Sequence, residues 1–202
     1  METLRIIPLG GLGEVGKNMT VYELGDETIV VDAGLAFPRD EHLGVDLILP
    51  DVGYLRDRHV RAVVLTHAHE DHVGGLPYLM REVQVGEVWA TRLTLGLVKS
   101  KLDEHGLLRS AELREIDPEE GPLDAGPFRL EFVRMAHSVP DAVGICIETP
   151  AGRVFHTGDW KLDHTPVDGL RTDVGRLAEL GNRGIDLLLG DSTNAERPGF
   201  TR

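Results

Sequence analysis

Three histidines and neighbouring acidic side chains crowd into residues 66–72, which read THAHEDH. They directly follow the apolar run AVVL at residues 62–65, a pattern typical of a buried strand. Zinc binds histidine nitrogen and carboxylate oxygen readily, and a loop at a strand end can spread alternate side chains around a cation. Several histidines are hard to satisfy together in a core, and a solvated loop has no need of them. The stretch therefore predicts a metal site built from three imidazoles and a carboxylate.

Two more candidate ligands stand where an expected strand ends in a turn. His137 follows FVRMA, and Asp159 follows VFHTG. Alone, a histidine after a strand is usually structural, and a Gly-Asp pair is usually a turn. Beside the cluster, however, their strand-end positions let several loops converge on one rim, which is how metal sites are commonly assembled.

The elements that must position these residues follow from short apolar or alternating runs separated by turn residues. The pattern is mixed α/β with hairpins and differs from a strict βαβ alternation. A turn at Gly25-Asp26 makes the second and third strands antiparallel neighbours. We expect strands over residues 4–8, 20–24, 28–31, 62–66, 128–135, 143–149, 153–157 and 185–189, and helices over 75–82 and 92–105.

The composition indicates one ordinary globular domain with an acidic balance. The chain has 202 residues, 41% of them hydrophobic and 27% charged, which is enough to enclose one core. A formal net charge of -13 argues against a generic nucleic-acid binder, because phosphate contacts normally come from lysine and arginine clusters. Carboxylates that hold divalent cations would account for part of this acidity.

The sequence also predicts a soluble, cytoplasmic protein. The first residues lack the pattern of a signal peptide, and no run approaches the roughly 18 to 20 apolar residues that a membrane helix needs. The one cysteine, Cys146, lies in the apolar run VGICI, which excludes an intramolecular disulfide and favours a buried strand position.

The spacing His67-x-His69-x-Asp71-His72, followed by a distant histidine and then an aspartate, resembles the metal signature of the metallo-β-lactamase superfamily. The resemblance implies an αββα sandwich with two zinc ions, for which Mn²⁺ or Mg²⁺ could substitute. It assigns one zinc to His67, His69 and His137. It assigns the second zinc to Asp71, His72 and Asp159, with Asp159 bridging both. Asp32, in VVDAG, matches the acidic residue that supports the site without binding metal.

Four flanking segments resemble the bacterial ribonuclease J family, of the β-CASP branch. They are GGLGEVGKNM at 10–19, DAGLAFP at 32–38, TGDWKLD at 157–163 and DSTNAERPGFT at 191–201. Asp191 falls at the acidic position of β-CASP motif A. The resemblance implies hydrolysis of RNA phosphodiester bonds, both 5′-to-3′ exonucleolytic and endonucleolytic, with Asp71 and Asp159 as catalytic carboxylates. It further implies roles in mRNA decay and rRNA maturation, a homodimer or tetramer at full length, and membership of RNA-degradation assemblies.

The family is much longer than this chain, and the resemblance divides the chain unequally. Residues 1–190 match the N-terminal part of the metallo-β-lactamase domain, and residues 191–202 match the beginning of the β-CASP domain. The last histidine ligand of the second zinc belongs to the part of the family that follows. We therefore expect an incomplete second site, impaired activity in the fragment, and a net charge that does not exclude RNA.

Three other interpretations stand beside this one. Gly11-x-Gly13-x-x-Gly16 matches the dinucleotide-binding fingerprint, but that fingerprint must open a helix, and a strand is expected here. The chain could instead be another hydrolase of the same fold, or a zinc-binding fragment without catalysis. His156, beside the Thr-Gly-Asp turn, either supports the metal site from behind or is an ordinary packed residue.

Overall fold

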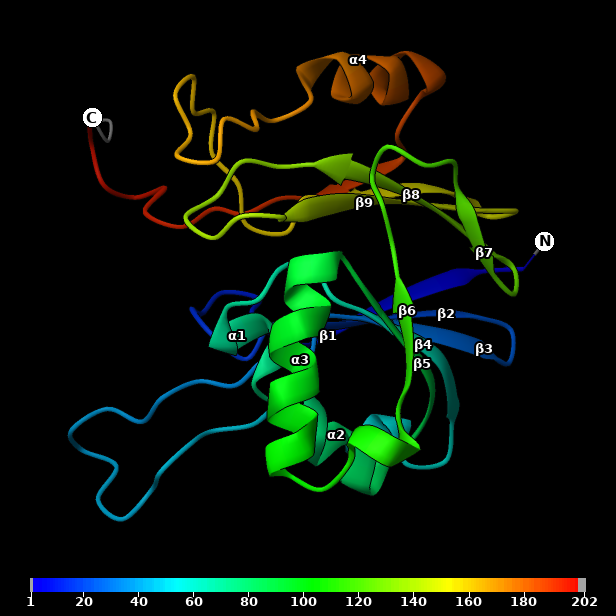
Figure 1. Ribbon diagram of the computed structural model, residues 1–202. Helices are drawn as coiled ribbons and strands as arrows, with labels where there is room; N and C mark the ends of the chain where they lie inside the picture. Colours follow the sequence, from blue (N-terminus) through cyan, green and yellow to red (C-terminus); the bar gives the residue numbers. More distant parts are fainter. Residues whose placement is uncertain (1, 200–202) are drawn as a thin grey trace.

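The computed structural model describes residues 2–199 and contains two facing β-sheets with helices on their outer sides (Figure 1). The first sheet has the order β1-β2-β3-β4-β5-β6 and the second has the order β11-β10-β9-β8-β7. The strands of the first sheet are β1 (Leu4–Gly10), β2 (Met19–Leu24), β3 (Glu27–Val31), β4 (His59–Val64), β5 (Gln84–Ala90) and β6 (Glu112–Glu115). Those of the second are β7 (Leu123–Ala125), β8 (Phe128–Arg134), β9 (Val143–Thr149), β10 (Gly152–His156) and β11 (Leu187–Leu189).

Four α-helices and two short 3-10 turns complete the described elements. The helices are α1 (Glu70–Val73), α2 (Leu76–Glu82), α3 (Arg92–Glu104) and α4 (Val174–Arg183), and the 3-10 turns are Gly53–Leu55 and Leu108–Ser110. Figure 1 shows α4 over the outer face of the second sheet and α1, α2 and α3 beside the first sheet. Within residues 2–199, no helix is long and apolar enough to cross a membrane.

Three apolar layers separate the four layers of secondary structure, as an αββα sandwich requires. One core lies between the first sheet and α2 and α3, and it includes Val63, Leu79 and Val98. The second lies between the sheets, where Trp89 packs with residues of β8 and β9. Strand β2 is buried along its whole length because it has a core on each face. The expected fold class is thereby confirmed.

The topology brings the ends of several strands to one edge. Strands β3 and β4 are parallel, and β8 and β10 both pair antiparallel with β9, so within each sheet the carboxyl ends of these strands lie at one edge. The Val143 amide, at the start of β9, donates to the Thr66 carbonyl at 3.0 Å and joins the two edges. Loops that follow β4, β8 and β10 therefore open onto a shared rim.

The hairpin of β2 and β3 and both expected helices are present within a few residues of their expected bounds. The structure adds β5, β6, β7, α1 and α4, which the apolar patterns did not indicate. In the sequence of β5, Gly86 and Glu87 interrupt the apolar pattern and obscure the alternation typical of a strand. Helix α4 contains two glycines, which are poor helix formers. Cys146 is buried in β9 as expected, and burial raises the pKa of its thiol to about 11.

The amino end of α3 is capped by a residue from the loop between β8 and β9 of the second sheet. Asp141 Oδ2 accepts from the Leu93 amide at 3.0 Å, and the Asp141 carbonyl accepts from the Thr91 hydroxyl at 3.0 Å. Asp141 also adopts a φ of 70°, in the left-handed region that asparagine and aspartate tolerate better than alanine. These bonds tie the loop that carries His137 to the first layer.

Replacing Asp141 by alanine should lower the free energy of unfolding by about 2 kcal/mol, about half from the lost cap and half from the left-handed backbone. Asp141→Asn keeps both a side-chain acceptor and a residue that tolerates this φ, and it should change stability by less than about 0.5 kcal/mol. Urea denaturation of both variants measures the difference. Equal stability of the two variants would show that neither the capping bond nor the left-handed backbone at this position contributes.

Candidate metal centre

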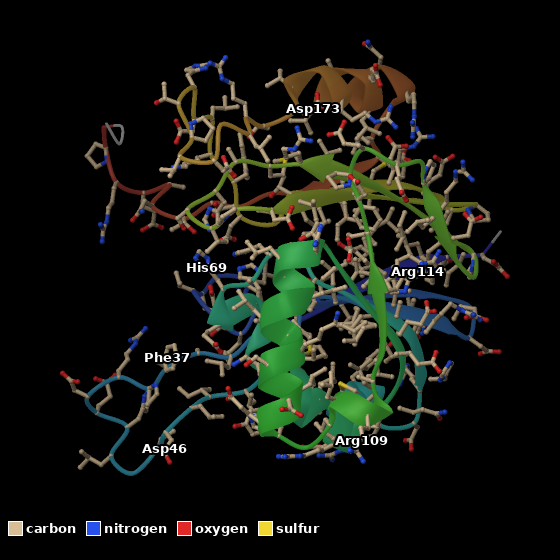
Figure 2. All side chains as sticks on the ribbon, viewed as in Figure 1. Phe37, Asp46, His69, Arg109, Arg114 and Asp173 are labelled. Carbon is tan, nitrogen blue, oxygen red and sulfur yellow. The ribbon has the colours of Figure 1, made fainter. Side chains whose placement is uncertain are left out.

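Three loops on the shared rim bring four potential ligands together. His67 and His69 follow β4, His137 follows β8, and Asp159 follows β10. One ligand atom from each of these side chains lies within 4.8 Å of all the others. Figure 2 shows His69 at the edge of the molecule, at the level where the two sheets meet. The predicted convergence of the histidine cluster with His137 and Asp159 is present in the structure.

The spacing of these four atoms suits a tetrahedral zinc ion. Zinc bonds of about 2.0 to 2.1 Å place tetrahedral ligands roughly 3.3 to 3.4 Å apart. His69 Nδ1 lies 3.0 Å from His67 Nε2 and 3.2 Å from His137 Nε2, and His137 Nε2 lies 3.6 Å from Asp159 Oδ2. One hydrogen can join only one pair of nitrogens, whereas a cation would satisfy all three at once. The four residues therefore fit a zinc ion.

The three imidazole rings stand around this point at nearly equal separations. The ring centroids of His67 and His69 are 4.8 Å apart, and His137 lies 4.9 Å from each of them. The planes of these pairs meet at 80°, 76° and 78°. Such mutually tilted rings direct their nitrogens inward, as they would around a cation, and differ from a stacked aromatic cluster.

His67 and Asp159 are held in the protonation states that a metal ligand needs. Burial and the charge of His72 lower the pKa of His67 to about 2, so its imidazole is neutral. The Thr66 hydroxyl donates to Asp32 and accepts from His67 Nδ1 at 3.0 Å, which leaves the lone pair on Nε2. Burial raises the pKa of Asp159, but its hydrogen bond to His72 and the histidine charges outweigh burial and lower it to about 2.

Asp71 and His72 extend the same centre on the side of α1. His72 Nε2 lies 3.3 Å from Asp159 Oδ1 and 3.7 Å from Asp71 Oδ2. The other oxygen of Asp159 faces His137, so this carboxylate stands between the two groups of ligands. Burial lowers the pKa of His72, but Asp32 and Asp159 outweigh it and raise the pKa to about 10. The carboxylates around His72 therefore favour a positive charge at this position, and a second cation would take the place of the proton on Nε2.

Asp32 lies behind the candidate ligands and contacts Thr66 and His72. It is 1% exposed, and its carboxylate accepts from the Thr66 amide at 2.8 Å and from His72 Nδ1 at 2.7 Å. The bond from Nδ1 fixes the orientation of the His72 ring and turns its Nε2 toward the rim. Thr66, which joins Asp32 to His67, is a functional neighbour that spacing alone did not single out.

Two further residues with expected roles lie near the centre without entering the ligand cluster. His156 Nδ1 is 2.8 Å from the Tyr22 hydroxyl, and burial lowers the pKa of the imidazole. The Asp191 amide donates to the Thr157 hydroxyl at 3.0 Å, so the start of the segment after β11 is bound to the loop that carries Asp159. Between these residues in the sequence, Trp160 packs against the apolar layer under α4.

Asn18 contacts the centre and was missed as a candidate because it lies 53 residues before Asp71 in the chain. The loop that carries it also decides the dinucleotide alternative. After Gly16 the chain enters β2, which pairs with β3 in a hairpin, so the glycines do not open a helix. The dinucleotide-binding interpretation was wrong.

Comparison with known proteins agrees with this geometry. The profile of the metallo-beta-lactamase superfamily matches residues 12–188. A solved structure of a protein of unknown function from Enterococcus faecalis superposes with a TM-score of 0.73 at 19% identity, over 100% of this chain and 52% of the other. The chain belongs to the metallo-β-lactamase superfamily, whose fold and histidine-rich rim it shares.

Within that superfamily the chain is a homologue of ribonuclease J. It is 49% identical to ribonuclease J from Thermus thermophilus, over 99% of this chain and 36% of the relative. It is 44% identical to ribonuclease J2 from Bacillus subtilis, again over 99% of this chain and 36% of the relative. The chain spans about a third of the length of these curated relatives.

Proposed function

We propose that this chain carries the metal centre of a zinc-dependent ribonuclease that hydrolyses phosphodiester bonds of RNA. The observation that carries the proposal is the convergence of His67, His69, His137 and Asp159 on one point at the rim of the sandwich. The identity to proteins named ribonuclease J supports RNA as the substrate. By the same likeness, the activity combines 5′-to-3′ exonucleolytic and endonucleolytic cleavage.

In this proposal the ligands divide into two groups that share one carboxylate. His67, His69 and His137 would hold one zinc ion, and Asp71 and His72 would hold a second, with Asp159 between the two groups of ligands. Bound zinc would act as a Lewis acid that lowers the pKa of a water molecule and offsets negative charge on the phosphate.

The protein's own contribution is to place and orient the groups around the phosphate. Asp71, whose side chain is 34% exposed at the rim, orients the attacking water and accepts its proton. Asp32 and Thr66 hold His72 and His67 behind the rim and keep them in fixed orientations. Mn²⁺ or Mg²⁺ can replace zinc, with Asp71 and Asp159 offering the oxygen ligands that those ions prefer.

The first position should bind zinc more tightly than the second. Three imidazoles and a carboxylate form a complete set for the first ion, whereas the second has only Asp71, His72 and the shared Asp159. We therefore expect two classes of zinc affinity in the 202-residue chain, together with little or no cleavage of a 5′-monophosphorylated RNA. Native mass spectrometry during zinc titration measures the two zinc affinities, and gel analysis measures cleavage of the RNA. Two equally tight zinc ions with rapid RNA turnover would contradict both expectations.

A zinc-binding role without catalysis is the competing function, because the same ligands serve both. Zinc that binds tightly but never supports RNA cleavage, even in a chain extended to the length of the relatives, would favour that role. Cleavage by the extended chain that His67→Ala abolishes would favour the ribonuclease.

The wider setting follows from the same likeness. We propose that residues 1–190 form part of the metallo-β-lactamase domain and that 191–202 begin the β-CASP domain, with Asp191 at its motif A. We further propose a cytoplasmic protein that acts in mRNA decay and rRNA maturation, within RNA-degradation assemblies and as a homodimer or tetramer. His156 is proposed to support the centre through its bond to Tyr22.

A further inference from the structure

Asn18 is fixed against the metal rim by its main chain. Its amide donates to the Asp71 carbonyl at 2.9 Å, and its carbonyl accepts from the Gly34 amide at 2.9 Å. The approach is so close that a Cβ on Gly34 would lie 1.7 Å from the Asp71 carbonyl oxygen and 2.8 Å from the Asn18 nitrogen. Glycine at position 34 thus allows the loop after β1, the loop after β3 and α1 to meet. The main chain of Asn18 holds its place independently of its side chain.

The side-chain amide of Asn18 is directed at the same residue. Its Nδ2 lies 3.1 Å from the Asp71 carbonyl and 3.3 Å from Asp71 Oδ2. An amide nitrogen carries two hydrogens, and these two oxygens use both. The same nitrogen lies 3.1 Å from His72 Nε2, so it sits between the carboxylate and the imidazole that would hold the second cation. Asn18 therefore contacts both ligands that belong to the second position alone.

The Asp71 carboxylate depends on this contact for its orientation. Its side chain is 34% exposed, and among residues 2–199 the Asn18 amide is its one hydrogen-bond donor. His72, by contrast, is 3% exposed at the side chain and has Asp32 behind it. Loss of the Asn18 amide would leave His72 in place and let the Asp71 side chain rotate toward solvent.

We propose that Asn18 is a positioning residue that sets the affinity of the second metal position by holding the Asp71 carboxylate beside His72. The inference rests on the proposed two-cation function and deepens it. The first position, formed by His67, His69, His137 and Asp159, lies outside the reach of these hydrogen bonds. The two cations should therefore respond differently to changes at position 18.

Asn18→Leu provides the test, because leucine keeps the branched shape and the number of side-chain heavy atoms of asparagine and lacks a donor. Asn18→Ala, which removes the donor without adding bulk, serves as a second variant. Each should weaken binding of the second cation by about 10- to 100-fold, as loss of an outer hydrogen bond to a ligand usually does, and leave the first unchanged. Titration with Co²⁺ follows both positions, because its visible absorption reports the ligand geometry. The second set of absorption changes should shift to higher Co²⁺ concentration while the first set stays.

The matched control is Asn182→Leu, which makes the same change at an exposed asparagine of α4 that is not one of the residues of the metal centre. Equal affinity for the second cation in the wild type and both Asn18 variants would overturn the inference, as would a wild-type protein that binds one Co²⁺ only. An equal loss of affinity for both cations would also overturn the inference, since that result indicates general damage to the site. A protein that binds two cations with the expected selectivity, yet cleaves no RNA at the length of the relatives, would instead defeat the proposed function.

Discussion

Replacing Asp32 by alanine should lower the free energy of unfolding by about 3 to 5 kcal/mol, the usual cost of leaving a buried charged group without its partner. Asp32 is 1% exposed, and it accepts from the Thr66 amide and from His72 Nδ1. Without the carboxylate, the buried Thr66 amide has no acceptor, and His72 Nδ1 loses its acceptor and the nearest counter-charge. The backbone of Asp32 also has a φ of 62°, a left-handed conformation that alanine tolerates poorly. Urea denaturation in the presence of a chelator measures the loss.

Asp32→Asn separates the shape of this residue from its charge. Asparagine tolerates the left-handed backbone and can still accept from the Thr66 amide, so this variant should retain more stability than Asp32→Ala. Its amide no longer favours a proton on His72 Nδ1, so the proton moves to Nε2 and the second cation should bind more weakly. Asp124→Ala, at an exposed carboxylate of β7, is the matched control and should change stability by less than about 0.5 kcal/mol. Equal stability of Asp32→Ala and the control would contradict the supporting role.

The convergence of the candidate ligands could be predicted from sequence because they follow short apolar runs. His67, His137 and Asp159 each stand three residues beyond the end of a strand, and strand ends that share an edge meet in space. For these three residues, the apolar pattern of the preceding strand and the metal-binding chemistry of the side chain therefore indicated the same place in the fold. The apolar runs indicated a mixed α/β fold with hairpins, whereas the αββα sandwich was expected from the resemblance of the metal-ligand motif to that of the superfamily.

The rest depended on tertiary contacts that the local sequence does not carry. The helix α4 contains two glycines, and it is held by Arg176 and Arg183, which pair with the buried Glu131 at 2.8 and 2.9 Å. No local propensity reveals such pairs, because the partners lie 45 and 52 residues apart. Asn18 illustrates the same limit within the site. Its role depends on a loop that closes onto α1, and only the packing around Gly34 makes that contact visible.

Replacing His67 by alanine should remove tight zinc binding at the first position. His67 is fully buried, its pKa keeps it neutral, and its Nε2 faces the point where the four ligand atoms converge. Zinc binding to a complete four-ligand set is worth about 10 to 16 kcal/mol, so one ligand contributes roughly a quarter of that. The dissociation constant should therefore rise by about 10² to 10³-fold, which competition with a chromophoric chelator measures.

The effect of zinc on the unfolding midpoint of His67→Ala should distinguish a metal ligand from a core residue at this position. Excess zinc should raise the unfolding midpoint of the wild type, because a ligand that binds only the folded chain stabilises it by mass action. His67→Ala should lose most of that increase, whereas His164→Ala, at an exposed histidine between Asp159 and α4, should keep it. If His67→Ala melted lower than the wild type by the same amount with and without zinc, then His67 would be a packing residue. The histidine cluster would in that case owe its geometry to the core, and no cation would need to be invoked at this rim.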